Sequence, residues 1–243
     1  NNSLDQDVLQ ISDHFNIYIL KTKDRFLKVV DDREVIRLNA LGNFRELLSA
    51  SMHSPAMLIY LDNASSTKDG PTENYSRELM ELHTLGVNGG YSQNDVVDAA
   101  RALTGWSVTL PRNGGEIGKF VFHEQTHDNE SKKILGVDFP AGQGIKDGEQ
   151  LVDLLANHPS TADHISYKLV RRFVSDTPPP ALVSRTSAAF QASHGDIGTV
   201  LRVIFFSDEF RASLGLKLKR PFEYVVSALR QTSANTKFNN PTN

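Results

Sequence analysis

The sequence predicts a mainly α-helical fold, a single helical domain that carries a small β-hairpin insertion. Several segments repeat apolar residues at the spacing of a helix, and Ser, Pro and Gly stand where helices would begin and end. One central stretch carries short β-like runs instead. With 243 residues, 39% of them hydrophobic, the chain is long enough to bury a core of its own.

End signals support the predicted helices one by one. Ser54 and Pro55 follow the usual order of cap and first turn, and Gly86 stands where a left-handed residue closes a helix. Ser92, with Asp95 three residues later, predicts a capping box. The predicted helices cover approximately residues 42–52, 55–62, 73–85, 93–103, 147–157, 159–175, 180–193, 196–206 and 221–231.

The middle of the chain has a different pattern. Residues 119–122 and 133–137 are short β-like runs on either side of a polar turn, which predicts a hairpin insertion at about 117–138. The sequence contains no internal repeat, so we expect one domain over residues 1–234 and a flexible tail at 235–243.

Composition excludes several classes of partner and site. Acidic and basic residues are mixed along the chain and give a formal net charge of −3, so the basic surface that a nucleic acid requires is not predicted. No apolar run approaches the roughly 20 residues of a membrane-spanning helix. Cysteine is absent, which excludes disulfides, thiolate metal ligands and cysteine nucleophiles.

The predicted helix over 73–85 places a carboxylate where apolar residues are expected. At about 100° per residue, Glu78 falls inside the apolar stripe of this helix, and Asn74 and Glu81 border the same edge. A carboxylate that faces a core must be hydrogen-bonded, paired with a cation or protonated. The stripe itself consists of Tyr75, Leu79, Leu82 and Leu85.

Two other predicted helices carry cations on the sides that they are expected to bury. Arg101 lies beside one apolar stripe, and Arg172 borders another, with Lys168 one turn before it. We therefore expect these cations to meet the carboxylates described above. The meeting has two interpretations: a structural ion-pair network, or a pocket in which Glu78 and Glu81 carry out acid–base chemistry.

The histidines give weaker signals. On an ordinary helix His83 is predicted to point away from Glu78, and it lacks the second histidine that completes a zinc-protease helix. His123 and His127 could bind a metal together with Asp128, but a polar hairpin tip explains them equally well. No metal and no cofactor are therefore predicted.

One long motif is the run Thr-Glu-Asn-Tyr-Ser-Arg-Glu-Leu-Met-Glu-Leu-His-Thr-Leu-Gly at 72–86. It resembles the hallmark of a bacterial family known as domain of unknown function 1800, in which Asn is usual at the position of Thr72. The resemblance extends from about His14 to Arg230. Further motifs similar to those of the family lie at 41–48, 54–63, 100–106, 127–128, 158–162 and 219–223.

The resemblance implies an exported, helix-rich bacterial protein that works in the periplasm or outside the cell. Members of the family usually carry more chain at both ends. We therefore expect this chain to be a fragment or a processed product, with missing segments or a partner chain beside its termini. The resemblance also implies work on extracellular polymers, and it supplies no agreed catalytic residues.

Two functions follow as hypotheses, and we favour the first. It is a hydrolase-like enzyme that acts on an extracellular carbohydrate or other polymer, with Glu78 and Glu81 as its catalytic carboxylates. The residues expected to bind substrate are Asn74, Arg101, Arg172, His14, Asp62, Asn63 and His127. The alternative is a non-catalytic assembly or binding protein of the envelope or extracellular matrix, in which the buried charges only lock helices together.

Overall fold

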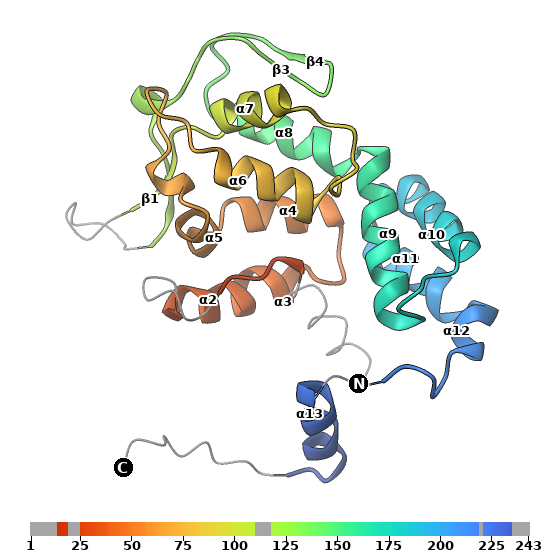
Figure 1. Cartoon of the computed structure of the whole chain (residues 1–243). Helices are drawn as coiled ribbons and strands as arrows, with labels where there is room; N and C mark the ends of the chain where they lie inside the picture. The colour runs from red at the N-terminus through yellow and green to blue at the C-terminus, as the bar shows by residue number, and fades with distance from the viewer. Residues whose placement is uncertain (1–13, 19–24, 110–117, 219–220, 235–243) are drawn as a thin grey trace, which may run out of the picture.

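The computed structural model describes residues 14–18, 25–109, 118–218 and 221–234, and within these ranges the chain is mainly α-helical, as the sequence predicts. Figure 1 shows the helices in their order along the chain. They are α2 (Arg25–Asp31), α3 (Arg37–Asn39), α4 (Phe44–Met52), α5 (Pro55–Tyr60), α6 (Glu73–Glu78), α7 (Gln93–Ala102), α8 (Lys146–Ala156), α9 (Pro159–Phe173), α10 (Pro180–Ala192), α11 (Ile197–Phe205), α12 (Asp208–Ala212) and α13 (Pro221–Gln231). The predicted tail at 235–243 lies outside the described residues, and the single domain over 1–234 stays a prediction.

Local end signals account for most of the helix boundaries. The predicted capping box is present at the start of α7, where the hydroxyl of Ser92 accepts from the backbone N–H of Asp95 and the Asp95 carboxylate accepts in return. Ser54 occupies the cap position of α5, but its hydroxyl donates to Asp31 Oδ1 at 2.5 Å instead of capping the helix. The helical segment 25–39 was not predicted; it contains a π-helical turn at Asp32–Ile36 between α2 and α3.

The central β structure differs from the prediction of one hairpin. β1 (Trp106–Val108) pairs with β2 (Phe120–Phe122), and β3 (Lys132–Ile134) pairs with β4 (Val137–Phe139), both antiparallel. The run that suggested a single strand folds back on itself at Leu135 and Gly136, whose φ angles are 51° and 80°. Positive φ at both central residues is the condition for the tight turn that joins two hairpin strands. The first predicted run therefore pairs with Trp106–Val108 and the second pairs with itself, and the two runs do not pair with each other.

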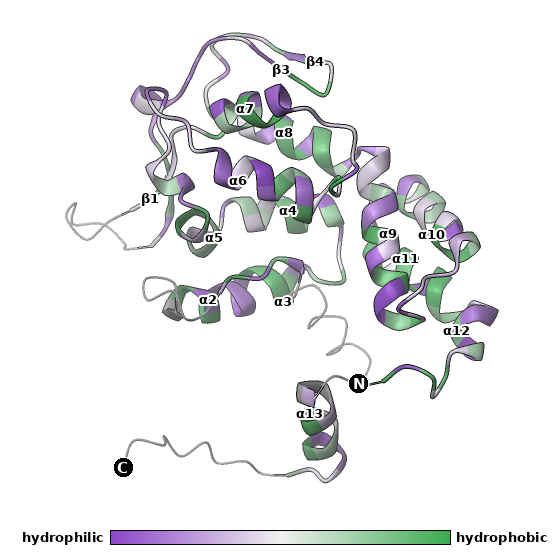
Figure 2. Cartoon of the chain, viewed as in Figure 1, coloured by the Kyte–Doolittle hydropathy of each residue, from purple (hydrophilic) through white to green (hydrophobic). Residues whose placement is uncertain are grey.

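The core is one cluster of buried apolar side chains that reaches from Phe15 to Ile204 and includes residues of α9, α10 and α11. Buried apolar side chains from α4 to α8 belong to it, and its largest fully buried members include Trp106 and Tyr75. On one side of this body α9, α10 and α11 pack against one another (Figure 1). Hydrophilic and hydrophobic residues both occur along α9 and α13 (Figure 2), as expected of amphipathic helices.

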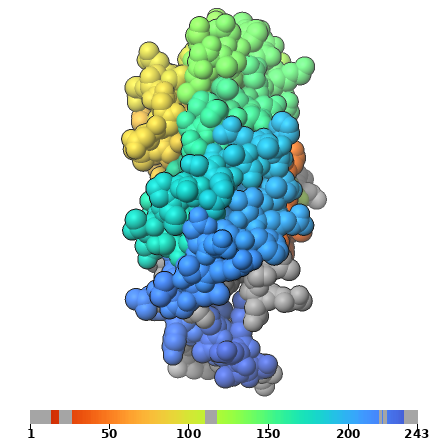
Figure 3. Space-filling view, turned by 90° about the vertical axis from the view of Figure 1, so that its right-hand side faces the viewer, coloured from red at the N-terminus to blue at the C-terminus, as the bar shows by residue number. Residues whose placement is uncertain are grey.

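The C-terminal segment extends away from this body. The C-terminal residues form the lower end of the face seen in Figure 3, and α13 stands apart from the other helices in Figure 1. Several large apolar side chains of this part are exposed, among them Leu218 at 92% and Tyr224 at 68%. None of the helices in the described part of the chain combines the length and apolarity that a bilayer crossing requires.

Candidate functional site

The helix that carries Glu78 changes its winding directly after that residue. The predicted helix over 73–85 is α-helical only at Glu73–Glu78 and continues as a π-helix at Leu79–His83. In a π-helix each N–H bonds to the carbonyl five residues earlier, so a turn takes more residues than in an α-helix. Residues five apart therefore come to the same side, and His83 joins Glu78 instead of pointing away from it as predicted.

The same widening alters which apolar residues are buried. Met80, which is not part of the predicted stripe, is fully buried, while Leu82, which belongs to that stripe, is 45% exposed. The helix ends as predicted at Gly86, whose φ is 82° and whose N–H donates to the Met80 oxygen at 3.1 Å. The hydroxyl of Thr84 donates to the carbonyl of Leu79, the first residue of the π-helix, at 2.7 Å.

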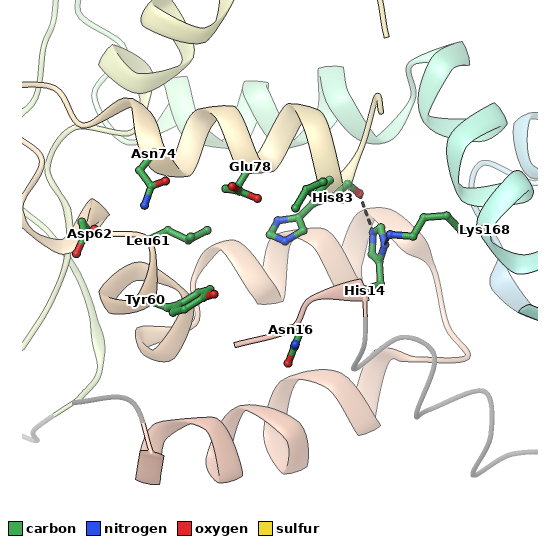
Figure 4. Close-up of a pocket in the computed structure, with 10 residues that line it drawn as sticks. His14, Asn16, Tyr60, Leu61, Asp62, Asn74, Glu78, His83 and Lys168 are labelled. Atoms are coloured by element: carbon green, nitrogen blue, oxygen red, sulfur yellow. Dashed lines mark hydrogen bonds between the residues drawn. The ribbon is translucent and has the colours of Figure 1, made fainter. Parts of the chain in front are cut away.

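A polar cleft of about 550 Å³ lies along this helix, within the usual size range of small-molecule sites. Its walls come from the N-terminal segment, the end of α5, the α6 and π-helical segment, and α9. Figure 4 shows Asp62 toward one end of the cleft, Lys168 at the other end and Glu78 between them. The lining residues are His14, Asn16, Tyr60, Leu61, Asp62, Asn74, Glu78, Leu82, His83 and Lys168.

Glu78 is a half-buried carboxyl on the wall of this cleft. Burial raises the pKa of Glu78, and the neighbouring charge of Glu81 raises it further. Both effects favour the protonated carboxyl, which can donate its proton to a bound molecule. Glu81 is not among the described residues that line the cleft, so it acts on Glu78 through its charge.

Asp62 reaches the cleft from a different element. It follows the end of α5, where the chain turns into the short 3-10 segment Asn63–Ser65. Its φ is 63°, a left-handed conformation that Asp and Asn adopt more readily than other residues with side chains. The sharp turn places a second carboxylate on the cleft that Glu78 lines.

His14 connects two walls of the cleft through its ring nitrogens. Nε2 of His14 lies 2.9 Å from the backbone oxygen of His83, and Nδ1 lies 2.7 Å from Nζ of Lys168. A carbonyl oxygen only accepts, so Nε2 carries the proton; an ammonium only donates, so Nδ1 accepts. His14 is therefore neutral with a fixed tautomer. Burial, and then the charge of Lys168, hold the pKa of His14 well below its usual value, in agreement with this assignment.

Two further histidines surround the Lys168 end of the cleft. Burial, and then the charge of Lys168, lower the pKa of His83 to about 3. Burial and the same ammonium lower the pKa of His164, whose Nε2 donates to the Leu82 oxygen at 3.3 Å. These imidazoles are neutral near pH 7, so they add no positive charge to that of Lys168.

The cleft brings together part of the predicted site. Four of the residues predicted as catalytic or substrate-binding line it, namely His14, Asp62, Asn74 and Glu78. Arg172 is not among its lining residues in the described part of the chain. Asn63 is fully buried and its amide donates to the backbone oxygens of Leu103 and Trp106, each at 3.1 Å.

The predicted meeting of Arg101 with the carboxylates of its neighbouring helix is wrong. Nε of Arg101 donates to Asp128 Oδ2 at 2.8 Å, and Nη1 donates to Asp98 Oδ1 at 2.7 Å. These bonds tie α7 to the segment before β3. The arginine therefore has the structural role that was one of the two interpretations open for it.

His127 lies in a buried polar cluster and not in the cleft. Its Nε2 is 3.2 Å from Asp147 Oδ2, which also accepts from Lys132 Nζ at 2.7 Å. The Lys132 ammonium donates as well to the backbone oxygens of Asp128 and Glu130, at 2.5 and 2.8 Å, so all three of its protons are used. Within the described residues no group of three or more histidine or carboxylate side chains is arranged to hold a metal ion.

Sequence reasoning missed Asn16, Tyr60, His83 and Lys168 as lining residues. His83 was missed because the π-helix was not expected. Lys168 did carry a signal, since it lies one turn before Arg172 on the same side of α9. Which of the two cations reaches the cleft depends on how α9 is rotated against its neighbours, and the sequence pattern leaves that rotation open.

Comparison with known proteins identifies a family for this chain. A family model described as "Protein of unknown function (DUF1800)" matches residues 4–243, nearly the whole chain. No curated protein and no solved structure matches it.

Proposed function

The chain belongs to the family of unknown function DUF1800, and from the geometry of its cleft we propose that it is a hydrolase-like enzyme that cleaves glycosidic bonds in an extracellular carbohydrate polymer. One observation carries the proposal: two carboxylates from different elements, Glu78 and Asp62, line the same polar cleft. Glycoside hydrolysis uses two carboxyl groups that flank the scissile bond. Glu78 and Glu81 on one helix would meet this requirement less readily.

The raised pKa of Glu78 assigns it the role of general acid. Its carboxyl proton passes to the glycosidic oxygen as the bond from that oxygen to the anomeric carbon breaks. Asp62 then acts either as the base that takes a proton from the attacking water or as the nucleophile that bonds to the anomeric carbon. The anomeric configuration of the product distinguishes these two roles, because the first inverts it and the second retains it.

The other side chains of the cleft suit a carbohydrate. The amides of Asn16 and Asn74 each offer donors and an acceptor, which match the hydroxyl groups of a sugar. Tyr60 offers an aromatic face and a hydroxyl on the same wall as Asp62. A carbohydrate therefore fits this lining better than an apolar ligand does.

Hydrolysis of a panel of bacterial and plant polysaccharides, followed by the release of reducing ends, tests the proposal. Glu78→Gln and Asp62→Asn should each reduce the rate at least about 100-fold, as expected when an acid–base group is lost. Glu81→Gln is the matched control on the same helix and should retain activity within several-fold near its own pH optimum. Equal rates for Glu78→Gln and the parent would rule out this site as the catalytic centre.

A second candidate, a non-catalytic assembly or binding protein, is favoured by the exposed apolar side chains near the C-terminus. Phe206 is 73% exposed, Leu216 76% and Leu218 92%. Exposed apolar groups of this kind often mark protein contacts. This candidate predicts self-association or partner binding that Leu216→Ser and Leu218→Ser abolish and that Glu78→Gln leaves unchanged, as measured by sedimentation.

A further inference from the structure

We propose that the molecule bound in the cleft carries an anionic group, a carboxylate or a sulfate or phosphate ester, and that Lys168 and His83 bind this group. The inference rests on the proposed function for the identity of the rest of the ligand. The anion site itself is argued and tested without it.

The Lys168 ammonium is held at one end of the cleft. Its Nζ donates to Nδ1 of His14 at 2.7 Å, and His14 in turn donates to the backbone oxygen of His83 at 2.9 Å. This chain of hydrogen bonds links α9, the N-terminal segment and the π-helix. The positive charge is therefore fixed before a ligand arrives, which reduces the cost of ordering it on binding.

His83 supplies a polar group beside this charge. Its side chain is almost fully buried, at 5% exposure for the residue, and its ring points into the cleft in Figure 4. No hydrogen bond joins that ring to another residue in the described part of the chain. The ring nitrogens of His83 are not among the fully enclosed polar atoms that lack a partner in the described residues, and the residue lines the cleft, so a ligand oxygen there can accept the ring N–H.

The charges of the cleft are separated along its length. Lys168 lies at one end and Asp62 at the other, with Glu78 and the neutral His83 ring between them (Figure 4). An anionic group is attracted to the first end and repelled by the carboxylate at the second. A ligand with one anionic substituent would therefore bind in a single direction, which places a neutral part of it beside Glu78.

Titration with simple anions tests the site without any assumption about the polymer. The parent protein is labelled with ¹⁵N-histidine, and the ring signals of His14 and His83 are followed during addition of sodium sulfate or sodium acetate, with sodium chloride at equal ionic strength as reference. Saturable shifts are expected with sulfate, acetate or both. Shifts that are linear, or equal to those in chloride, overturn the inference.

Variants identify the responsible charge. Lys168→Gln should weaken anion affinity at least tenfold, because an ion pair and a charge-assisted hydrogen bond are lost. The matched control is Lys133→Gln, which removes an exposed lysine of β3 and should leave the affinity unchanged. His14→Gln retains an acceptor and a donor and should bind more tightly than His14→Phe. Equal affinity in Lys168→Gln and the parent overturns the inference.

The anion test and the hydrolysis test can fail separately. Glu78→Gln should bind anions like the parent, because it leaves the Lys168 charge and the His83 ring in place. Saturable anion binding without Glu78-dependent hydrolysis supports the anion site and contradicts the proposed function. Glu78-dependent hydrolysis without saturable anion binding supports the proposed function and contradicts the anion site. A response to acetate alone indicates a carboxylate-bearing ligand, and a response to sulfate alone indicates a sulfate or phosphate ester.

Discussion

The position of Glu78 on its helix determines the pKa of its carboxyl group. Burial on the wall of the cleft and the charge of Glu81 both favour its protonated form. Its position in an apolar stripe could be predicted from the sequence, because helical periodicity is a local property. The sequence could not show which carboxylates the arginines pair with. A cation on the buried side of a helix has the same sequence pattern whichever carboxylate it contacts.

Replacing Glu81 with Gln should lower the pKa of Glu78, because a nearby negative charge is removed while burial remains. A general acid is active only when protonated. The alkaline limb of the pH–rate profile should therefore move to lower pH in Glu81→Gln, by up to about one pH unit. A ¹³C NMR titration of the Glu78 carboxyl measures the shift directly. Glu149→Gln, a change in the exposed start of α8, is the control, and an unchanged Glu78 pKa in Glu81→Gln would contradict the argument.

At the scale of elements, local sequence signals predicted most of the helices. They did not predict which strands pair or where the α-helix becomes a π-helix. Ser92 and Asp95 are three residues apart, so their capping box is visible in the sequence. The two hairpins were mistaken for one because the turn at Leu135 and Gly136 lies inside an apolar run. The π-helix was not predicted because its five residues make about one turn, which is too short for the spacing of apolar residues to distinguish it from an α-helix.

Gly86 should be essential to the end of the π-helix. Its φ is 82°, and a Cβ there would lie 2.7 Å from Nδ1 of His164. Gly86→Ala should lower the free energy of unfolding by about 2–3 kcal/mol, from the left-handed backbone and the contact together. Gly90→Ala is the matched control, because Gly90 has φ 85° and no heavy atom lies within 4 Å of the position that a Cβ would take. This substitution should lower the free energy of unfolding by only about 1 kcal/mol. Equal losses in urea unfolding would show that the contact with His164 is unimportant.

At the scale of the molecule, the structure contains two separate polar clusters, one that lines the cleft and one that is buried. The cleft holds one, and the other consists of Lys132, Asp147 and His127 between the β3–β4 hairpin and α8. Both clusters combine histidine, lysine and a carboxylate, so the sequence could not show that His127 belongs to the second. The separation depends on contacts between residues far apart in the chain, which no local pattern encodes.

Lys132→Met should destabilise the whole protein without altering the cleft. The substitution leaves the Asp147 carboxylate buried without its cation, which typically costs about 3–5 kcal/mol. The neighbouring Lys133→Met, at an exposed position, should change stability by less than about 0.5 kcal/mol. Urea unfolding measures both values. A loss in Lys132→Met no larger than that in Lys133→Met would show that the buried pair contributes little.

The left-handed backbone of Asp62 implies a trade-off between stability and activity. Glycine adopts this conformation without strain, so Asp62→Gly should raise the midpoint of thermal unfolding, by the equivalent of about 0.5–1 kcal/mol, while it removes the carboxylate that the hydrolysis requires. Asp62→Asn, which removes the charge and keeps a side chain that tolerates the turn, should leave the midpoint near that of the parent. If both variants are inactive and only the glycine variant is more stable, Asp62 contributes to activity and lowers the stability of the protein.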